Sequence, residues 1–328
     1  MARIFTYIVH RRGVADDSAF ELAAAARKID AAASPTAILT GWGGDLDAAC
    51  DAIRASYTET WKIANEALAY PNAELVRKAL HKVLPSNSIV LVAHEHFGID
   101  LAPGLSIKTN SAFVSDVLDI AGLEGADLKV VRQEFGGQVS AHVRCDVSSG
   151  AVVTIRPGAF KPLEGPPVSG DVIDKSNDVG GLVSGRRYLE TVVAEAGDVD
   201  ITKYNVLVSI GRGIQEKDNV AIAQELADAL GAAVSCSRPV VDAKWMDKSR
   251  QVGSSGKTVK PKVYLACGIS GSFQHLAGIK GSPFLIAINK NPKAPIFQVA
   301  DVGIVDDILE FLPELTNKVR EMRSVAAK

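Results

Sequence analysis

Glycine, serine and basic residues gather at three places in the second half of the sequence. At the first place, Gly211-Arg212-Gly213 follows the apolar segment 205–210 and precedes an expected helix, which is where α/β folds put a phosphate-binding turn. The third glycine of the dinucleotide fingerprint would fall at position 216, which is Glu216. The incomplete motif predicts either a phosphate turn or a tight strand-to-helix turn without a ligand.

The second place is Gly253-Ser-Ser-Gly-Lys-Thr258, which resembles the end of a Walker A loop. That motif requires a first glycine five residues before Gly256, where this chain has Gln251, and Lys257 precedes a proline-containing strand rather than a helix. The segment is therefore not predicted to bind ATP. Its hydroxyls and flexible backbone suit contact with a planar or anionic ligand, and an ordinary surface loop is the alternative.

The third place, Cys267-Gly-Ile-Ser-Gly-Ser-Phe-Gln-His275, follows the expected strand 263–267 and should open a helix. Backbone amides at such a helix start, with the hydroxyls of Ser270 and Ser272, suit a phosphate group. His275 lies one turn further on. A lone helical histidine is often structural, but this one is expected near the carboxyl end of a strand, where open α/β sheets bind ligands.

Other kinds of site find little support. His94-Glu95-His96 lacks the i, i+4 histidine spacing of a zinc helix, no nucleophile elbow GxSxG occurs, and we predict no metal site. The four cysteines form no CxxC pair and are expected to be buried thiols in a reducing compartment. They are Cys50, Cys145, Cys236 and Cys267.

Composition limits the partners of the chain. The net charge is −2 and aromatic residues make up 6%, which argues against a nucleic-acid-binding surface. No apolar run reaches the roughly 18 residues that a membrane span needs, and the start of the chain lacks a signal-peptide core. We therefore expect a cytoplasmic chain without a membrane span. Its 328 residues suit two domains.

Apolar runs alternate with amphipathic segments through the first domain, which predicts a mainly parallel α/β sheet flanked by helices. The expected strands are 3–9, 36–40, 88–93 and 187–195, and the expected helices are 20–32, 46–55 and 73–84. Three further strands without intervening helices, 128–135, 138–144 and 151–156, predict an antiparallel extension. Residues 157–180, rich in Pro, Gly and Asp, are expected to form an exposed connection.

A linker at 196–203 is expected to separate a first domain, residues 1–200, from a second, residues 204–328. The strand–helix rhythm then restarts, which predicts a Rossmann-like sheet in the second domain. Its expected strands are 205–210, 232–235, 263–267 and 284–288, and its expected helices are 219–230 and 304–320, the latter kinked or broken at Pro313.

The second domain resembles the electron transfer flavoprotein alpha subunit. The matching segments occur in the family's order and are 209–213, 237–242, 251–258, 264–278 and 287–307. The first domain resembles the family more loosely, at Asp100-Leu-Ala-Pro103 and in its general strand and helix order. Two departures stand out: Ser254-Ser255 replaces the usual Gln-Thr, and the stretch before Arg212 has one glycine fewer than usual.

The resemblance implies an FAD site in the second domain, completed by a beta subunit that the first domain contacts. The FAD contacts implied are Arg212, Ser237, Arg238, Val252, Gly253, Ser254, Ser255, Ser270, Gly271, Ser272, Phe273, Gln274, His275, Asn289, Asp307 and Ile308. Three of them are expected to tune the redox potential. Arg238 offers a cation, Ser255 a hydroxyl to flavin N5, and His275 a donor to the flavin C2 carbonyl.

The function implied is that of an electron carrier, a heterodimer with the beta subunit, rather than an enzyme with a bond-making substrate of its own. It would take electrons from acyl-CoA-type dehydrogenases and pass them to a quinone oxidoreductase or another acceptor. One alternative is the alpha subunit of an NADH-oxidising, electron-bifurcating flavoprotein complex. Another, without redox chemistry, is a nucleotide-binding scaffold.

Overall fold

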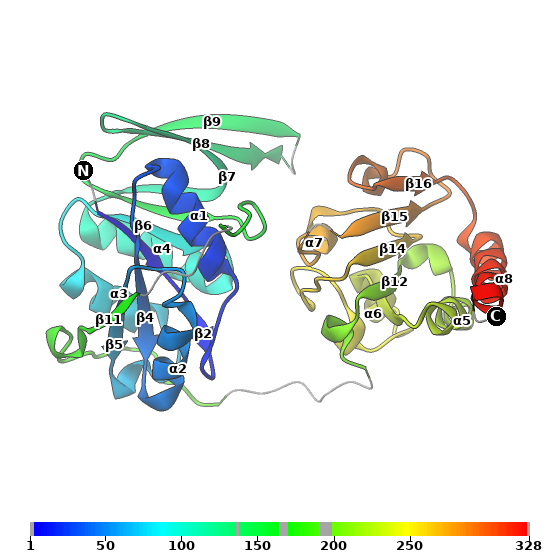
Figure 1. The fold of residues 1–328 in the computed structure, drawn as a ribbon, viewed down its shortest axis with the longest axis horizontal. Coiled ribbons are helices and arrows are strands. Elements are labelled where there is room, and N and C mark those ends of the chain that lie inside the picture. The colour runs from blue at the N-terminus through cyan, green and yellow to red at the C-terminus, as the bar shows by residue number, and fades with distance from the viewer. Residues whose placement is uncertain (1–2, 136–137, 164–169, 191–198, 282, 327–328) are drawn as a thin grey trace. The chain divides into compact units, whose positions relative to one another are not determined.

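The chain divides into two compact units, each built around its own sheet (Figure 1). The computed structural model describes residues 3–135, 138–163, 170–190, 199–281 and 283–326. The units comprise residues 1–190 and 191–328. Both sheets are mainly parallel and flanked by helices, which confirms the predicted α/β fold class.

The sheet of the first unit has the strand order β11-β5-β4-β1-β6-β10-β7-β8-β9 within the described residues. Neighbouring strands run parallel from β11 to β7, and β7, β8 and β9 pair antiparallel at one edge. The strands are β1 (Ile4–Tyr7), β4 (Thr36–Gly41), β5 (Glu59–Ala64), β6 (Ile89–Ala93), β7 (Ala112–Glu124), β8 (Asp127–Glu134), β9 (Val139–Asp146), β10 (Ala151–Ile155) and β11 (Asp171–Asp174). A separate short hairpin joins β2 (His10–Arg11) to β3 (Val14–Ala15).

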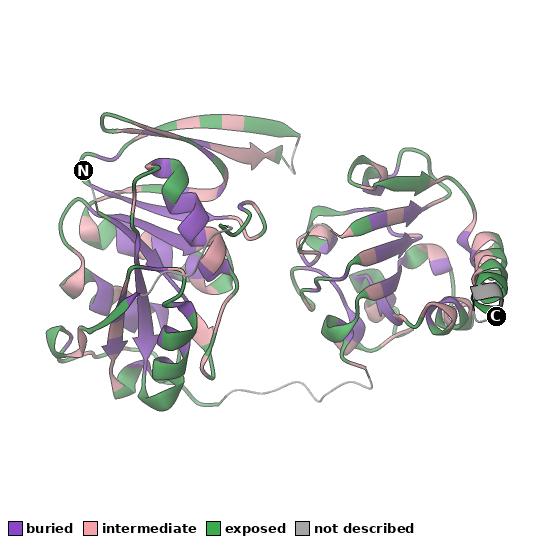
Figure 2. Cartoon of the chain, in the orientation of Figure 1, coloured by how far each residue is buried: buried purple, intermediate pink, exposed green. Residues whose placement is uncertain are grey.

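Helices cover both faces of this sheet because its central strands are apolar on both sides. On β6, Ile89 and Leu91 pack with α1 (Ser18–Ile29), whereas Val90 and Val92 pack with α3 (Ala73–Val83) and α4 (His96–Thr109). The central strands are accordingly buried, while the edge strand β9 alternates exposed and half-buried residues (Figure 2). A further helix of this unit is α2 (Gly43–Ile53).

Several expectations for the first unit need correction. Segment 151–156 is not part of the antiparallel extension: a turn at Gly150, with φ +90°, returns the chain so that β10 runs parallel between β6 and β7. The expected connection 157–180 contains β11, which adds a parallel edge strand to β5. Residues 187–190 form no strand, and 191–195 of that expected strand lie outside the described residues. β5, β7 and α4 were not predicted.

The sheet of the second unit has the parallel order β13-β12-β14-β15-β16 in the part of the chain that the structure describes. The first strand in sequence, β12, therefore lies between β13 and β14, and the chain changes direction across the sheet at that point. The strands are β12 (Val206–Ile210), β13 (Ala233–Cys236), β14 (Val263–Cys267), β15 (Phe284–Ile288) and β16 (Val302–Ile304). The helices are α5 (Val220–Leu230), α6 (Arg238–Asp242), α7 (Phe273–Leu276) and α8 (Ile308–Ala326).

α5 and α8 pack against each other on one face of this sheet (Figure 1). Pro313 lies inside α8 and does not end it, because Ile308 and Leu312 hold the first turns in the core. On the other face, Ile201 is fully buried against β12 and β14. The last residues of the expected linker thus form part of the second unit. No helix among the described residues is long and apolar enough to cross a membrane.

Candidate functional site

The residues expected to contact a ligand lie where the strands of the second unit reach their carboxyl ends. This end of the sheet is called the sheet edge below. Arg212 follows β12, Ser237 and Arg238 follow β13, and the segment 270–275 follows β14. Asn289 comes directly after β15, and Asp307 comes three residues after β16. Because all five strands are parallel, their carboxyl ends share an edge, and ligands of open α/β sheets bind at this edge where the strand order reverses.

Two glycine turns meet where the strand order reverses, between β12 and β14. The amide of Gly211 donates to the carbonyl of Cys267 at 2.8 Å, and that of Gly213 donates to Gly268 at 3.2 Å. A Cβ atom on Gly211 would lie 2.2 Å from the Gly268 carbonyl oxygen. This spacing excludes a side chain at Gly211, so the close turns depend on glycine.

The loop 251–258 closes on itself and exposes two serines at its tip. Lys257 donates from its amide to the Gln251 carbonyl at 2.7 Å, and the Gln251 side-chain amide donates to the Ser255 hydroxyl oxygen at 2.9 Å. Ser254 and Ser255 are exposed. Because a hydroxyl oxygen can accept a hydrogen bond and donate its own proton, Ser255 keeps a donor for a ligand.

Backbone hydrogen bonds attach this loop to the same sheet edge. The amide of Val252 donates to Cys236 at 2.9 Å, next to Ser237, and the amide of Ser254 donates to the Gln274 carbonyl at 2.7 Å. Gly253 lies between them with φ +140°. The loop therefore adjoins the residues that follow β13 and β14, as a common ligand site requires.

Ser270 to Gln274 form a mostly exposed turn that leads into α7. The serine hydroxyls at 270 and 272 and the ring of Phe273 are exposed. Gly271 has φ +87°, and a Cβ there would lie 2.4 Å from the amide nitrogen of Ile296. The turn thus presents hydroxyls at its surface while glycine lets its backbone pack closely against the segment after β15.

His275 is engaged within the protein. Its side chain is 4% exposed, Nδ1 lies 3.1 Å from the Val252 carbonyl oxygen, and Nε2 lies 2.8 Å from the Tyr264 hydroxyl. Since a carbonyl oxygen only accepts, Nδ1 carries a proton and donates to Val252. Burial lowers the pKa of His275 to about 4. A contact with a flavin carbonyl, which stays a prediction, would require one of these partners to be given up.

The Tyr264 hydroxyl links this histidine to the strands beneath it. Tyr264 is fully buried on β14, and its hydroxyl lies 2.6 Å from that of Ser209 on β12. Burial raises the pKa of this phenol far above its usual value. The sequence reading assigned no role to Tyr264, because only the fold brings it to His275.

The basic residues of the site differ from the histidine in being open to solvent. Arg212 is exposed, and the side chain of Arg238 is 68% exposed, with its Nε 3.4 Å from an oxygen of Asp242 one turn along α6. Ser237, directly before α6, is buried. Two cations are therefore available at the sheet edge, and Asp242 offsets part of the charge of Arg238.

The last three expected contacts are used in the fold itself. Asn289 donates from its side-chain amide to the Ile269 carbonyl at 2.9 Å. Asp307 accepts from the Leu309 amide at 3.0 Å, as a helix N-cap does, and pairs with Lys290 at 2.6 Å, which lowers the pKa of Asp307. Ile308 packs in the core. These residues follow β15 and β16, so they lie on the side of the sheet edge away from β13.

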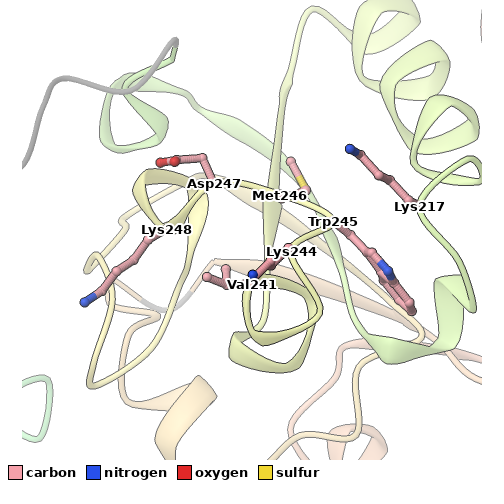
Figure 3. A pocket seen from close by; sticks show the side chains of 7 residues that line it. All are labelled: Lys217, Val241, Lys244, Trp245, Met246, Asp247 and Lys248. Carbon is pink, nitrogen blue, oxygen red and sulfur yellow. The ribbon is translucent and has the colours of Figure 1, made fainter.

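A pocket of about 460 Å³ opens beside α6, apart from these residues (Figure 3). Its lining consists of Lys217, Val241, Lys244, Trp245, Met246, Asp247 and Lys248. The ammonium groups of Lys217 and Lys248 lie on opposite sides of it in Figure 3, so they do not converge on one small ligand. None of the expected ligand contacts lines this pocket.

Comparison with known proteins adds the family. Residues 4–178 match the electron transfer flavoprotein domain, and residues 200–280 match the electron transfer flavoprotein FAD-binding domain. The electron transfer flavoprotein subunit alpha of Methylophilus methylotrophus is 36% identical over 319 residues, which is 96% of this chain and 98% of that protein. The subunit alpha of Clostridium acetobutylicum is 37% identical over 269 residues, 78% of each chain. Subunit LctC of lactate dehydrogenase (NAD(+),ferredoxin) from Acetobacterium woodii is 35% identical over 250 residues, 76% of this chain and 59% of that one.

The close turns at the strand reversal give a first prediction. Gly211→Ala should lower the free energy of unfolding of the second unit by about 1–3 kcal/mol, because the new methyl group meets the Gly268 carbonyl. Gly185→Ala, in the first unit, is the control for an added methyl group, since a Cβ there meets nothing within 4 Å and the second unit should keep its wild-type stability. Denaturant unfolding measures both. Equal stability of the two variants would show that the turns have room to separate.

The buried histidine gives a second prediction. Between pH 6.5 and about 4 the unfolded chain takes up a proton at His275 that the folded unit does not, so stability should fall as the pH falls through this window. The full difference is on the order of 3 kcal/mol. Unfolding of wild type and His275→Gln, measured from pH 7 to pH 4, should show a shallower pH dependence in the variant. Identical slopes in wild type and His275→Gln would contradict the prediction.

Proposed function

The chain belongs to the family of electron transfer flavoprotein alpha subunits, and we propose that it is the FAD-binding half of a heterodimeric electron carrier. Its partner in this proposal is an electron transfer flavoprotein beta subunit, as the name "subunit alpha" of its relatives implies. Its electrons come from acyl-CoA-type dehydrogenases and go to a quinone oxidoreductase or another acceptor. The first unit supplies the contact with the beta subunit.

The sheet edge of the second unit has the chemistry that FAD needs. A diphosphate and a flavin both accept hydrogen bonds, and the edge offers exposed hydroxyls, backbone amides and two exposed arginines. The glycine turns let the segments after β12 and β14 approach each other closely, because a Cβ on Gly211 would collide with the Gly268 carbonyl oxygen. The residues fit the cofactor, and the proposed contacts remain the sixteen residues of Arg212, 237–238, 252–255, 270–275, Asn289 and 307–308.

FAD, when bound, supplies reversible electron uptake, and the residues of the chain set how strongly that is favoured. Arg238 carries a permanent charge, so it stabilises negative charge that develops on a neighbouring group. Asp242 lies 3.4 Å from it and opposes the effect. At the tip of its loop, the Ser255 hydroxyl oxygen accepts a hydrogen bond from Gln251. The hydroxyl proton is not used in that bond and can be donated to the cofactor. His275 supports this loop from below through the Val252 carbonyl.

The match of residues 200–280 to an FAD-binding domain carries the proposal, and co-production with a beta subunit tests it. The full chain and a beta subunit should purify as a heterodimer with the visible absorption of a bound flavin. The chain alone should bind FAD more weakly, because many of the proposed contacts, among them Arg238 and Ser255, are exposed to solvent. A stable monomer that holds FAD tightly would contradict the heterodimeric site. A colourless complex that ignores added FAD would favour the scaffold alternative.

Arg238 gives a second test of the proposal. A charge-assisted hydrogen bond is worth about 1.5–3 kcal/mol, which is roughly 65–130 mV for one electron. The Arg238 side chain is 68% exposed in the chain alone, where solvent screens its charge, so in the heterodimer we expect an effect of at least tens of millivolts, nearer the full range the more the beta subunit excludes water. Arg238→Ala should lower the first reduction potential of the bound flavin by that amount, and Arg238→Lys should recover part of it.

Asp242→Asn is the matched variant of opposite sign. Removing the carboxylate leaves the Arg238 charge uncompensated, so the potential should rise. Spectroelectrochemical titration of the heterodimer measures all three variants. If a folded, FAD-loaded Arg238→Ala protein keeps the wild-type potential, Arg238 is not a tuning residue.

A second candidate function is electron bifurcation, which the similarity to the Acetobacterium woodii LctC subunit favours. This chain would then be the alpha subunit of a complex that oxidises NADH. NADH added to the purified heterodimer distinguishes the two functions. Flavin reduction by NADH alone supports bifurcation, and reduction only by an acyl-CoA dehydrogenase with its substrate supports the simple carrier.

A further inference from the structure

Asp200 and the three residues after it form an anchor near the start of the described part of the second unit. Asp200 precedes a short 3-10 helix, η4 (Ile201–Lys203), and its Oδ1 accepts from the Thr202 amide at 3.2 Å and from the Thr202 hydroxyl at 2.8 Å. Ile201 is fully buried in the same apolar cluster as Val252 and Tyr264. This anchor is therefore packed against the base of the loop 251–258.

Lys257 connects that loop to the anchor. Its Nζ lies 3.4 Å from Oδ1 of Asp200, and its backbone pairs with Val252 and Gln251 across the neck of the loop. This is the lysine of the Walker-like segment. Its ammonium group contacts the carboxylate of Asp200, a role quite different from that of a phosphate-binding lysine.

The Asp200 carboxylate is suited to hold this lysine. The contacts with Thr202, and then the ammonium of Lys257, lower the pKa of Asp200 to about 2, so it stays charged at neutral pH. A second cation, Lys203, lies 3.6 Å from Oδ2. It differs from Lys257 in that it belongs to η4 and its side chain is 79% exposed.

We propose that Asp200 and Lys257 are positioning residues for the flavin loop, holding Val252 to Ser255 in the form that binds FAD. The inference rests on the proposed function, since it assumes that this loop contacts the flavin. Lys257 is two residues from Ser255, and the two are joined through Gln251, whose carbonyl accepts from Lys257 and whose side chain donates to Ser255. Asp200 is therefore tied, through Lys257 and Gln251, to Ser255, the proposed N5 donor.

The expected effect is moderate, because both side chains are partly exposed. Such an ion pair changes an equilibrium constant by up to about fivefold, or about 1 kcal/mol. In the full chain with its beta subunit, Lys257→Gln and Asp200→Asn should each weaken FAD binding by about that factor. The double variant should bind FAD no more weakly than either single variant, because each single substitution already removes the same ion pair.

Lys203→Gln is the matched control, since it removes the other cation beside Asp200 without touching the loop. It should bind FAD as wild type does. FAD dissociation constants, the visible spectrum of the bound flavin and its potential are measured for each protein. Lys257→Arg should restore the affinity and the spectrum, which a general loss of stability would not allow.

Three outcomes would overturn the inference: wild-type affinity in both single variants, additive losses in the double variant, or an equal loss in Lys203→Gln. If the wild-type heterodimer itself binds no FAD, the proposed function fails instead. The two failures are thus distinguishable, because the first needs a wild-type complex that carries flavin.

Discussion

The second unit depends on the close approach of two turns at the point where its strand order reverses. The amide of Gly211 and the carbonyl of Cys267 bond across this point, and Gly268 fills the space where any side chain would collide. The approach brings the ends of β12 and β14 together, and the segments that follow them line one edge. Everything that could bind a ligand here, from the serine turn to the loop of Ser255, is positioned relative to that pair of turns.

The edge combines a buried polar support with an exposed polar surface. Beneath the loops, His275, Tyr264 and Ser209 satisfy one another, so their polar atoms cost little in the core. Above them, Arg238 and Ser255 face solvent. Burial keeps the histidine neutral, and the Val252 carbonyl oxygen fixes its proton on Nδ1, whereas the arginine keeps its charge whatever covers it. Rigid support below and available donors above are what a bound cofactor requires.

The sequence allowed the fold class to be predicted because strong local signals agree with tertiary burial. The run of apolar residues at 89–93 is buried on both faces, and Asn72 caps α3 with its side chain. Local signals failed where contacts between distant segments determine how a strand pairs. β10 follows a hairpin signal in the sequence but pairs in parallel with β6. α4 contains Pro103 and two glycines, yet packing of Leu101 and Leu105 keeps it helical.

The residue types that follow each strand predicted where the candidate ligand site lies. They did not predict which side chains contact one another there. Asp200 and Lys257 are 57 positions apart, and no sequence pattern links them. The exposure of Arg238 could not be predicted from the sequence either, and this exposure affects the redox chemistry. A charge in water acts weakly on its neighbours, and the same charge acts several-fold more strongly once water is excluded. If a beta subunit covers this edge, as proposed, the effect of Arg238 on the flavin grows on assembly, so the alpha chain alone would hold FAD without setting its final potential.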